Sequence, residues 1–160
     1  MIRLATKKDL DLILKIYEYA REFMKNNGNW SQWKDNFPPK EILINDIDNK
    51  QLYVYEENKE IYGVFAFIIG EDESYKNIEN GKWISDELYG TIHRVASNGK
   101  TKGLLSKIIA FCEKNISHLR IDTHSDNKIM QHLIIKNGFT KTGTIYVEDG
   151  SPRIAYEKVL

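Results

Sequence analysis

The sequence predicts an α+β domain with a mixed β-sheet, in which the elements follow the order β-α-α-β-β-β-α-β-α-β-β. Residues 51–70 hold two strand-like apolar runs around the polar triplet Glu57-Asn58-Lys59, which predicts an antiparallel hairpin. The strand–helix–strand pattern of residues 91–124 predicts a right-handed crossover between two parallel strands. Two more strand-like runs follow, so parallel and antiparallel pairs are expected in one sheet.

Length and composition are typical of a compact globular protein. The 160 residues suit a single domain over residues 1–160, and a hydrophobic fraction of 41% is too high for disorder. Lysine plus arginine and aspartate plus glutamate balance at 23 each, and no long basic block occurs, so no nucleic-acid partner is expected. The abundance of lysine, asparagine and isoleucine is typical of an AT-rich bacterial genome.

The distribution of cysteine, histidine and apolar residues argues against disulfides, metal sites and membrane-spanning segments. The single cysteine, Cys112, excludes an intrachain disulfide and a cysteine-based zinc site. His118 and His132 have no metal-ligand spacing around them, so we expect both at the surface and expect no metal site. The N-terminal run carries charges and lacks a signal-peptide core, and no uncharged apolar run approaches membrane-spanning length. A cytoplasmic protein without a membrane partner is therefore expected.

The first part of the chain predicts a short strand and a long amphipathic helix. Residues 2–4 form the strand candidate, and Thr6 and Asp9 have the spacing of a capping box. Apolar residues then recur at helical spacing, so a helix is expected over residues 7–25, before Gly28.

A loop with two tryptophans and a second helix come next. Residues 29–39 are aromatic and polar and end in proline, which indicates a loop, although Trp30 and Trp33 are unusual there. Pro39 suits the start of a helix that continues through Ile47.

The middle of the chain supplies three strands and one long connection. Residues 51–56 and 61–70 form the hairpin, and residues 91–96 form the next strand. Residues 71–89 between them are long and polar, which indicates either a functional loop or an extra edge of the sheet.

The last part of the chain alternates helices and strands. Gly138 stands in a helix-stop position. Two helices and three strands are expected, the helices at residues 102–114 and 126–137 and the strands at residues 119–124, 139–147 and 153–159.

The stretch RVASNGKTKGLL, residues 94–105, has two phosphate-binding interpretations. Gly99-Lys100-Thr101 resembles the end of a P-loop, but that motif needs a glycine five residues before Gly99, where Arg94 stands. In the second interpretation a strand leads through a short loop into a helix that begins near Lys102-Gly103. The free amides of its first turn, the helix dipole and the nearby lysines would suit a pyrophosphate.

The same stretch resembles the acyl-CoA motif of the GNAT superfamily of acetyl-CoA-dependent N-acetyltransferases. Lys100 stands where the motif has Arg or Gln, which keeps the charge and loses the fork geometry, and Leu105 stands where it has a small residue. Residues 93–97 resemble the family's fourth strand, and residues 119–139, with Asn127, resemble its fifth strand and following helix. The resemblance covers essentially the whole chain and implies a mixed sheet whose central parallel strands splay apart.

The resemblance implies acetyl-CoA as cosubstrate, with its pantetheine arm between the splayed strands. The fourth strand would hold that arm by its backbone, the helix N-terminus would hold the pyrophosphate, and Asn127 would contact the arm from the other side. The residues assigned to the cofactor are Val95, Ala96, Ser97, Lys100, Lys102, Gly103, Leu104, Leu105, Ser106 and Asn127.

The proton-transfer groups have several candidates. His124 is the favoured general base, because imidazole titrates in the required range; its alternative role is structural, holding the strand-to-helix turn with Asp126. His93 is the second candidate base, and Glu71 and Glu73 are further ones. Many family members place a tyrosine acid in the helix before Gly-Phe, where this chain has Ile134, so Tyr146 or water would replace it.

The acceptor is expected to be a primary amine of a small molecule, an amino acid or a peptide. Trp33 and Tyr75 are assigned to its pocket, and Asp122 is expected to be a hydrogen-bonded structural carboxylate. The alternative function is a catalytically silent module that binds acyl-CoA, and a P-loop nucleotide enzyme is a third. A homodimer through the last two strands is compatible with the sequence.

Overall fold

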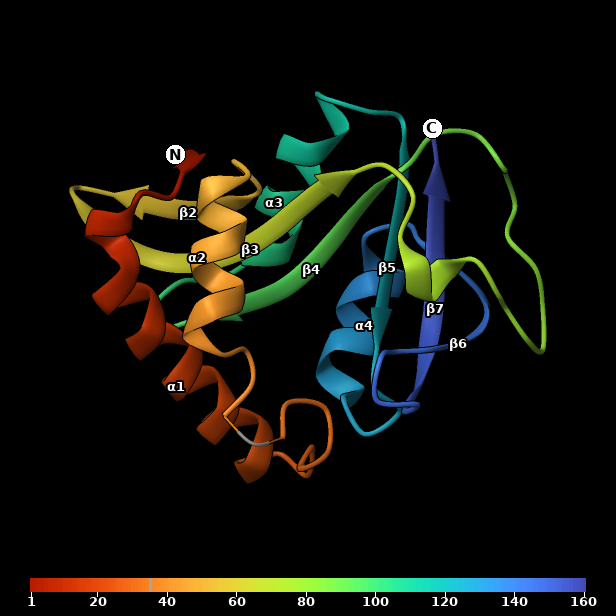
Figure 1. Ribbon diagram of the computed structural model, residues 1–160, viewed down its shortest axis with the longest axis horizontal. Helices are drawn as coiled ribbons and strands as arrows, with labels where there is room; N and C mark the ends of the chain where they lie inside the picture. Colours follow the sequence, from red (N-terminus) through yellow and green to blue (C-terminus); the bar gives the residue numbers. More distant parts are fainter. Residues whose placement is uncertain (35) are drawn as a thin grey trace.

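The computed structural model describes residues 1–34 and 36–160, and its core is a seven-stranded mixed sheet in the order β1-β2-β3-β4-β5-β7-β6 (Figure 1). The strands are β1 (Ile2–Leu4), β2 (Leu52–Glu57), β3 (Glu60–Ile69), β4 (Gly90–Ser97), β5 (His118–Thr123), β6 (Thr140–Tyr146) and β7 (Pro152–Val159). The α-helices are α1 (Leu10–Asn26), α2 (Lys40–Asp48), α3 (Leu104–Glu113) and α4 (Lys128–Lys136), and the 3-10 turns are η1 (Lys7–Asp9) and η2 (Glu73–Tyr75). The predicted α+β class and order of elements are confirmed.

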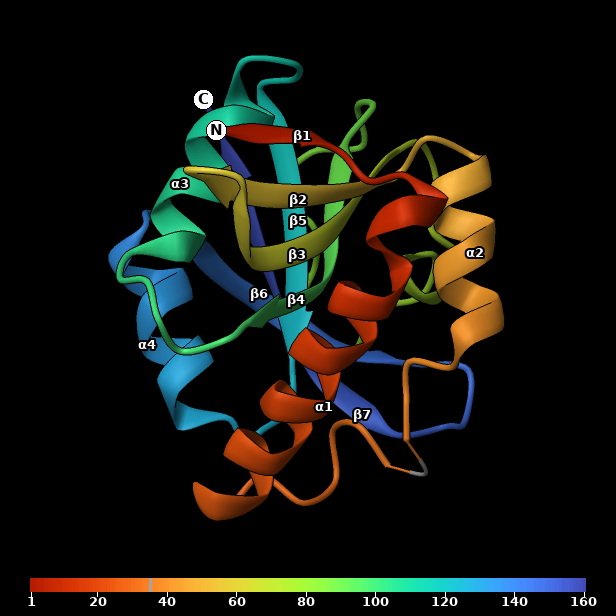
Figure 2. The ribbon, with the colours of Figure 1, turned by 90° about the vertical axis from the view of Figure 1, so that its left-hand side faces the viewer.

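Helices cover both faces of the sheet. Helices α1 and α2 lie on one face and α3 and α4 on the other (Figure 2). Each pair closes its own apolar cluster, one around Ile13 and Leu43 and the other around Ile108 and Ile134. The helical spacing of apolar residues read from the sequence therefore corresponds to these two buried faces. No helix in the described part of the chain is long and apolar enough to cross a membrane.

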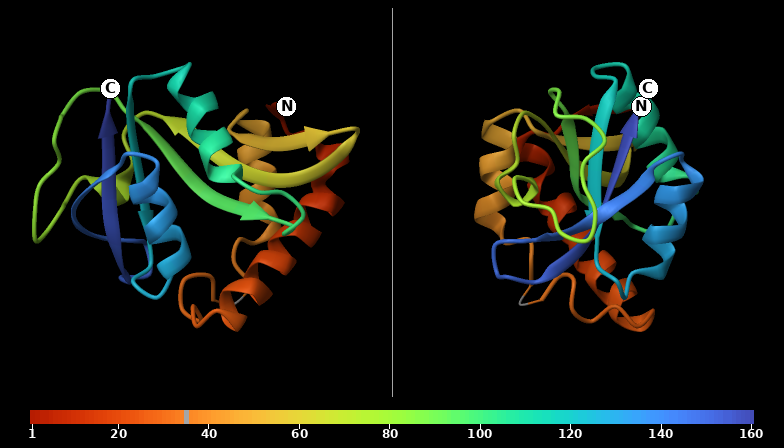
Figure 3. Two further views of the ribbon diagram at one scale, coloured as in Figure 1. Left: turned by 180° about the vertical axis from the view of Figure 1, so that it is seen from behind. Right: turned by 90° about the vertical axis from the view of Figure 1, so that its right-hand side faces the viewer.

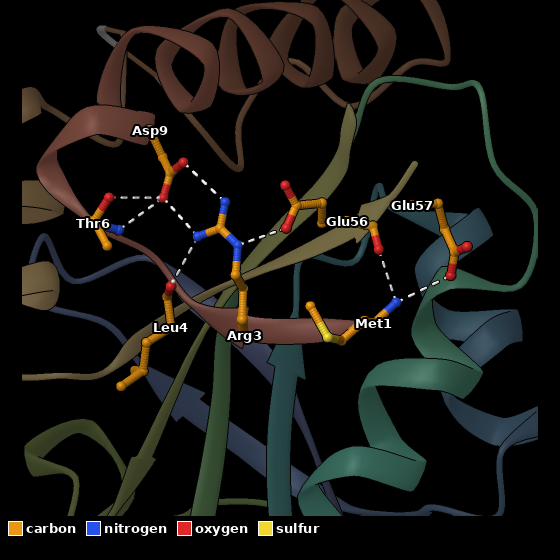
Figure 4. A network of polar contacts seen from close by, with 7 residues as sticks. All are labelled: Met1, Arg3, Leu4, Thr6, Asp9, Glu56 and Glu57. Atoms are coloured by element: carbon orange, nitrogen blue, oxygen red, sulfur yellow. Dashed lines mark hydrogen bonds and ion pairs between the residues drawn. The ribbon is translucent and has the colours of Figure 1, made fainter. Parts of the chain in front are cut away.

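An ion-pair network joins β1 to the start of the first helical segment (Figure 4). The Arg3 guanidinium donates to both carboxylate oxygens of Asp9, at 2.9 and 3.0 Å, and to Glu56 at 2.7 Å. The Thr6 amide also donates to Asp9, as the predicted capping box requires. These bonds from Arg3, with the help of Thr6, outweigh burial and lower the pKa of the Asp9 carboxyl.

The parallel pair at the centre of the sheet separates soon after it forms. Only Gly90 with Leu119 and Thr91 with Arg120 are in register between β4 and β5, although both strands continue. The left view in Figure 3 shows β4 turning toward α1 while β5 continues beside α4. The predicted splayed parallel strands are therefore confirmed, and the space between them is where ligand cavities open.

Residues 71–89 cover one face of β6 and β7, where Tyr75 and Tyr89 pack against Ile145 and Ala155. Of the two predicted roles, a sheet edge is present only as an isolated bridge between Glu79 and Thr144. Glu157 instead holds the segment, because its carboxylate accepts from the Ile84 amide at 2.5 Å and contacts His118 and Arg120.

The expectation that His118 lies at the surface is wrong. His118 is 3% exposed because Glu157, fully buried on the neighbouring strand, supplies a partner for its ring. His132 is exposed on α4, as expected.

Candidate active site

Two cavities meet where β4 and β5 separate. The first, which we call the α3 groove, has a volume of about 400 Å³ and runs between α1, β4, the start of α3 and α4. The second, the central cavity, has a volume of about 770 Å³ and is lined by the loop after α1, by β4 and β5, and by the β6–β7 turn. The two share the side chains of Met24, Val95, Asn127 and Met130. A ligand in one cavity can therefore touch a ligand in the other.

The α3 groove contains most of the predicted cofactor residues. The eight of them that line it are Val95, Ala96, Ser97, Gly103, Leu104, Leu105, Ser106 and Asn127. Lys100 and Lys102 lie outside its lining, and the Lys100 ammonium points into solvent, 3.8 Å from Glu60. The loop carries these two lysines around its outer side, so any contribution to anion binding is through long-range charge.

The N-terminus of α3 presents free amides at one end of the α3 groove. Gly103 is the N-cap residue, with a φ of +68° that favours glycine. A Cβ at this position would meet nothing within 4 Å, so the space beside the helix N-terminus is open. The first-turn amides of a helix have no partner within the helix. Leu105 is 4% exposed and packs into the core below α3. The departure from the family motif at Leu105 therefore leaves the helix end open, and an anionic group fits there.

A β-bulge in β4 forms the wall between the two cavities. The register with β3 shifts between Val64 and Ala66, and Arg94 has a φ of +52°. The Tyr17 hydroxyl donates to the Arg94 carbonyl at 2.7 Å, and Asp46 accepts from the Arg94 guanidinium at 2.8 Å. A bulge leaves its extra residue out of the ladder, so backbone groups beside Val95 are available to a ligand.

The bulge and the residues that fix it were not predicted from the sequence. A non-glycine residue at positive φ carries no local signal in the sequence. Tyr17 and Asp46 occur in ordinary helical patterns, and only the fold brings them to Arg94.

Asn127 connects the cavities to the loop after α1. Its side-chain oxygen accepts from the Met130 amide and caps α4, and its amide donates to Gln32 at 3.0 Å. The same Gln32 oxygen accepts from Asn29 at 2.9 Å and from Thr123 at 3.4 Å. Gln32, which sequence reasoning did not assign to the site, thus ties the loop across the opening to β5 and α4.

A histidine–carboxylate pair lies in the lining of the central cavity. His93 Nε2 is 2.8 Å from Asp72 Oδ2, and the Ser74 amide donates to the other oxygen of Asp72 at 2.9 Å. Burial opposes ionisation of Asp72, but the hydrogen bond and charge of His93, with the Ser74 amide, bring the pKa of the Asp72 carboxyl below its usual value. An ionised carboxylate only accepts, so when the imidazole is neutral its proton stays on Nε2 and Nδ1 is left as a base.

Tyr75 lies beneath the central cavity and does not line it. It is 2% exposed, and its hydroxyl donates to Asp122 at 2.6 Å. Burial raises the pKa of the Asp122 carboxyl, although His93 and the Tyr75 bond act in the opposite direction. Asp122 is therefore hydrogen-bonded, as the sequence predicted for a structural carboxylate. Tyr75 is its hydrogen-bond donor and does not line the pocket to which the sequence assigned it.

His124 and Tyr146 are not brought together with the site. The His124 ring accepts from the Asp126 amide at 3.0 Å, which is the structural role in the strand-to-helix turn. Burial, with the charge of Arg153, lowers the pKa of His124. Tyr146 is exposed, and its hydroxyl donates to Glu79 at 2.9 Å on the outer edge of the sheet. Neither residue lines either cavity.

The remaining predicted positions separate into cavity wall and core. Trp33 lines the central cavity and packs edge-on against Tyr17 at 5.5 Å between ring centroids, whereas Trp30 is exposed. Ile134 is fully buried in the core, so α4 presents Met130 and Leu133 to the α3 groove instead. Within the described residues no cluster of three potential metal ligands occurs.

The fold is thus a mixed sheet that opens between its two parallel strands, with one cavity at a helix N-terminus and another beyond a β-bulge. A scan against models of protein families and a search of curated proteins each gave no match. Solved structures do match. A GNAT-family acetyltransferase from Streptococcus agalactiae is 31% identical, with a TM-score of 0.89, over 100% of this chain and 95% of that chain.

Two further structures agree in fold. A candidate acetyltransferase from Staphylococcus aureus is 32% identical, with a TM-score of 0.73, over 99% of this chain and 98% of that one. A protein from Salmonella typhimurium, solved with its cofactor acetyl-CoA, is 19% identical, with a TM-score of 0.62, over 100% of this chain and 93% of that chain. The chain belongs to the GNAT family of acetyltransferases.

Proposed function

We propose that the protein transfers an acetyl group from acetyl-CoA to a primary amine. The observation that carries the proposal is the meeting of the α3 groove and the central cavity at Val95, Asn127 and Met130. Transfer requires the thioester and the amine to be held in contact, and a shared wall provides that proximity.

The α3 groove is the site proposed for the cofactor. The first-turn amides of α3, beginning after Gly103, suit the pyrophosphate. Val95, at the β4 bulge, lines the same groove, and the backbone groups beside it would lie near the thioester end. Acetyl-CoA supplies the activated carbonyl, and a preorganised backbone amide there would stabilise the negative charge that develops on its oxygen.

His93 replaces His124 as the proposed general base. Nδ1 of His93 makes no hydrogen bond within the described residues, and the Asp72 carboxylate orients the ring through Nε2. His93 would take the proton of the acceptor ammonium, with Asp72 stabilising the resulting imidazolium. The thiolate needs no dedicated acid, since a thiol pKa of about 8.5 makes it a competent leaving group.

A silent module that binds acyl-CoA is the second candidate function. It is favoured by one observation, the apolar pair Met130 and Leu133 that α4 presents where an acid could stand. The two functions share the α3 groove and differ only in turnover.

A thermal-shift titration with acetyl-CoA, CoA and ATP-Mg tests the cofactor site. A ligand at about 100 times its Kd stabilises by roughly 2.7 kcal/mol, which raises the Tm of a domain of this size by several degrees. We expect a shift with both CoA compounds and none with ATP-Mg. Asn127→Ala removes the N-cap of α4 and so lowers the Tm of the unliganded protein. Its CoA-induced shift is therefore measured from its own unliganded Tm, and we expect that shift to be smaller than in the wild type.

The opposite pattern would overturn the proposal. A shift with ATP-Mg alone would support a nucleotide enzyme, and no shift with CoA would mean that the α3 groove does not accept the cofactor. A CoA shift without turnover on any amine would favour the silent module.

A further inference from the structure

One arginine in the wall of the central cavity has no carboxylate partner among the residues that the structure describes. Arg153, on β7, is 7% exposed. Its Nη1 donates to the Pro152 carbonyl at 3.2 Å and its Nη2 to the Gln32 carbonyl at 3.1 Å. Among residues 1–34 and 36–160, no carboxylate lies within 4.0 Å of the guanidinium. A guanidinium has five N–H donors, so most of its donor capacity is unused by this part of the chain.

The other well-buried arginines of the described chain are each paired with an acid. Arg94 contacts Asp46 at 2.8 Å, and Arg120 contacts Glu157 at 3.3 Å. Burying a charge without a partner is costly, and burial lowers the pKa of Arg153 accordingly. A cation kept in a cavity wall at this cost is typical of an anion-binding position.

Within the described part of the chain, the acids near Arg153 do not neutralise it. Asp122, on the adjacent strand β5, and Asp149, on the β6–β7 turn, are the acids whose fields reach it. Asp122 is hydrogen-bonded to Tyr75, and burial raises its pKa. Glu148 and Asp149 line the rim of the cavity and are exposed, so solvent screens them. The inner part of the β7 wall is therefore positive.

The polar groups of the central cavity come from two sides. His93 and Asp72 lie toward β4, where the cavity meets the α3 groove, and Arg153 lies on β7. A ligand that spans them needs an amine at the first side and an anion at the second. An ion pair of guanidinium and carboxylate is often bidentate, which adds geometric selection to charge.

We propose that the acceptor is an amine that also carries a carboxylate, such as an amino acid or a short peptide with a free C-terminus, and that Arg153 binds this carboxylate. The inference rests on the proposed acetyl transfer, since it names the acceptor class for the same site. Arg153 is then a specificity residue, and His93 acts on the amine at the other side.

The test uses acceptors in matched pairs, the proteinogenic L-amino acids and glycyl dipeptides against their C-terminal amides. The wild-type protein is expected to show a higher kcat/KM for the carboxylates than for the amides. Arg153→Gln should lower kcat/KM for carboxylates by roughly 10²-fold, and leave the amides unchanged. Arg153→Lys keeps the positive charge but loses the paired N–H donors of the guanidinium. Its kcat/KM for carboxylates should therefore lie between that of the wild type and that of Arg153→Gln.

Arg21→Gln is the matched control, because Arg21 also donates to a loop carbonyl, that of Phe37, at 3.3 Å, but lies outside the central cavity. It should leave the preference intact. The CoA-induced thermal shift of each variant confirms that the fold and the α3 groove remain. Equal use of acids and amides by the wild type, or an equal loss on both in Arg153→Gln, overturns the inference while acetyl transfer stands.

A binding measurement keeps the inference testable if no acceptor turns over. Calorimetric titration of the CoA-saturated protein with N-acetyl amino acids and with their amides should show binding of the acids alone, lost in Arg153→Gln. Failure of turnover with this binding present rejects the proposed transfer only, and failure of acid-selective binding rejects the role of Arg153.

Discussion

Replacement of His93 by glutamine is expected to lower kcat/KM for acetyl transfer by roughly 10²- to 10⁴-fold near neutral pH, the usual contribution of a general base. Glutamine keeps a similar volume and can still reach Asp72, 2.8 Å from the imidazole in the wild type, but it cannot take a proton. The CoA-induced thermal shift should not change, because His93 lines only the central cavity. The deficit should shrink as pH rises, because solvent then deprotonates the acceptor amine.

The matched control is His132→Gln, since His132 is exposed on α4 and lines neither cavity. Its rate should match the wild type at every pH. Asp72→Asn should give a smaller loss than His93→Gln, because it removes the orientation of the ring and leaves the base in place. A His93→Gln protein with wild-type kcat/KM and pH profile would show that His93 is not the base.

Glu157→Gln is expected to be the most destabilising single change in the described part of the chain. Glu157 is fully buried, and its carboxylate contacts His118 and Arg120 and accepts from the Ile84 amide at 2.5 Å. Removing one partner of a buried charge cluster costs about 3–5 kcal/mol. For a domain of this size we expect a fall in Tm of roughly 10 °C or more, measured by calorimetry.

The matched control is Glu113→Gln, which removes an ion pair with Lys158 at 2.6 Å near the surface. This pair is only partly exposed, with side chains 21% and 26% exposed, but solvent still reaches it, so the Tm should fall much less than in Glu157→Gln. The Glu157 variant should also release residues 71–89, seen as faster proteolysis or amide exchange in that segment. Equal small effects from both substitutions would contradict the anchoring role of Glu157.

The fold could be predicted because its signals are local and periodic. Helical spacing in residues 7–25 and the polar triplet at 57–59 each report on structure within a few residues. The parallel pair followed from the length of the crossover that contains α3, and it is present at Gly90 and Thr91. The α3 groove was found for the same reason, since the strand, short loop and helix N-terminus are contiguous in the chain.

The central cavity could not be predicted in detail because its parts are distant in sequence. His93 meets Asp72 only because β3 and β4 are antiparallel neighbours, and Arg153 reaches the Gln32 carbonyl across 121 residues. His124 was predicted as the base because it is a histidine at the end of a strand, but its Nδ1 accepts a hydrogen bond from the Asp126 amide. Composition and spacing do not show which of several polar residues face the same space.

The most direct test of the account is transfer of an isotopically labelled acetyl group from acetyl-CoA to an amino acid with a free carboxylate, followed by mass spectrometry together with detection of free thiol. We expect labelled N-acetyl product and one CoA thiol for each acetylated amine, both greatly reduced in His93→Gln. Tight CoA binding with no labelled amine from any acceptor would contradict it.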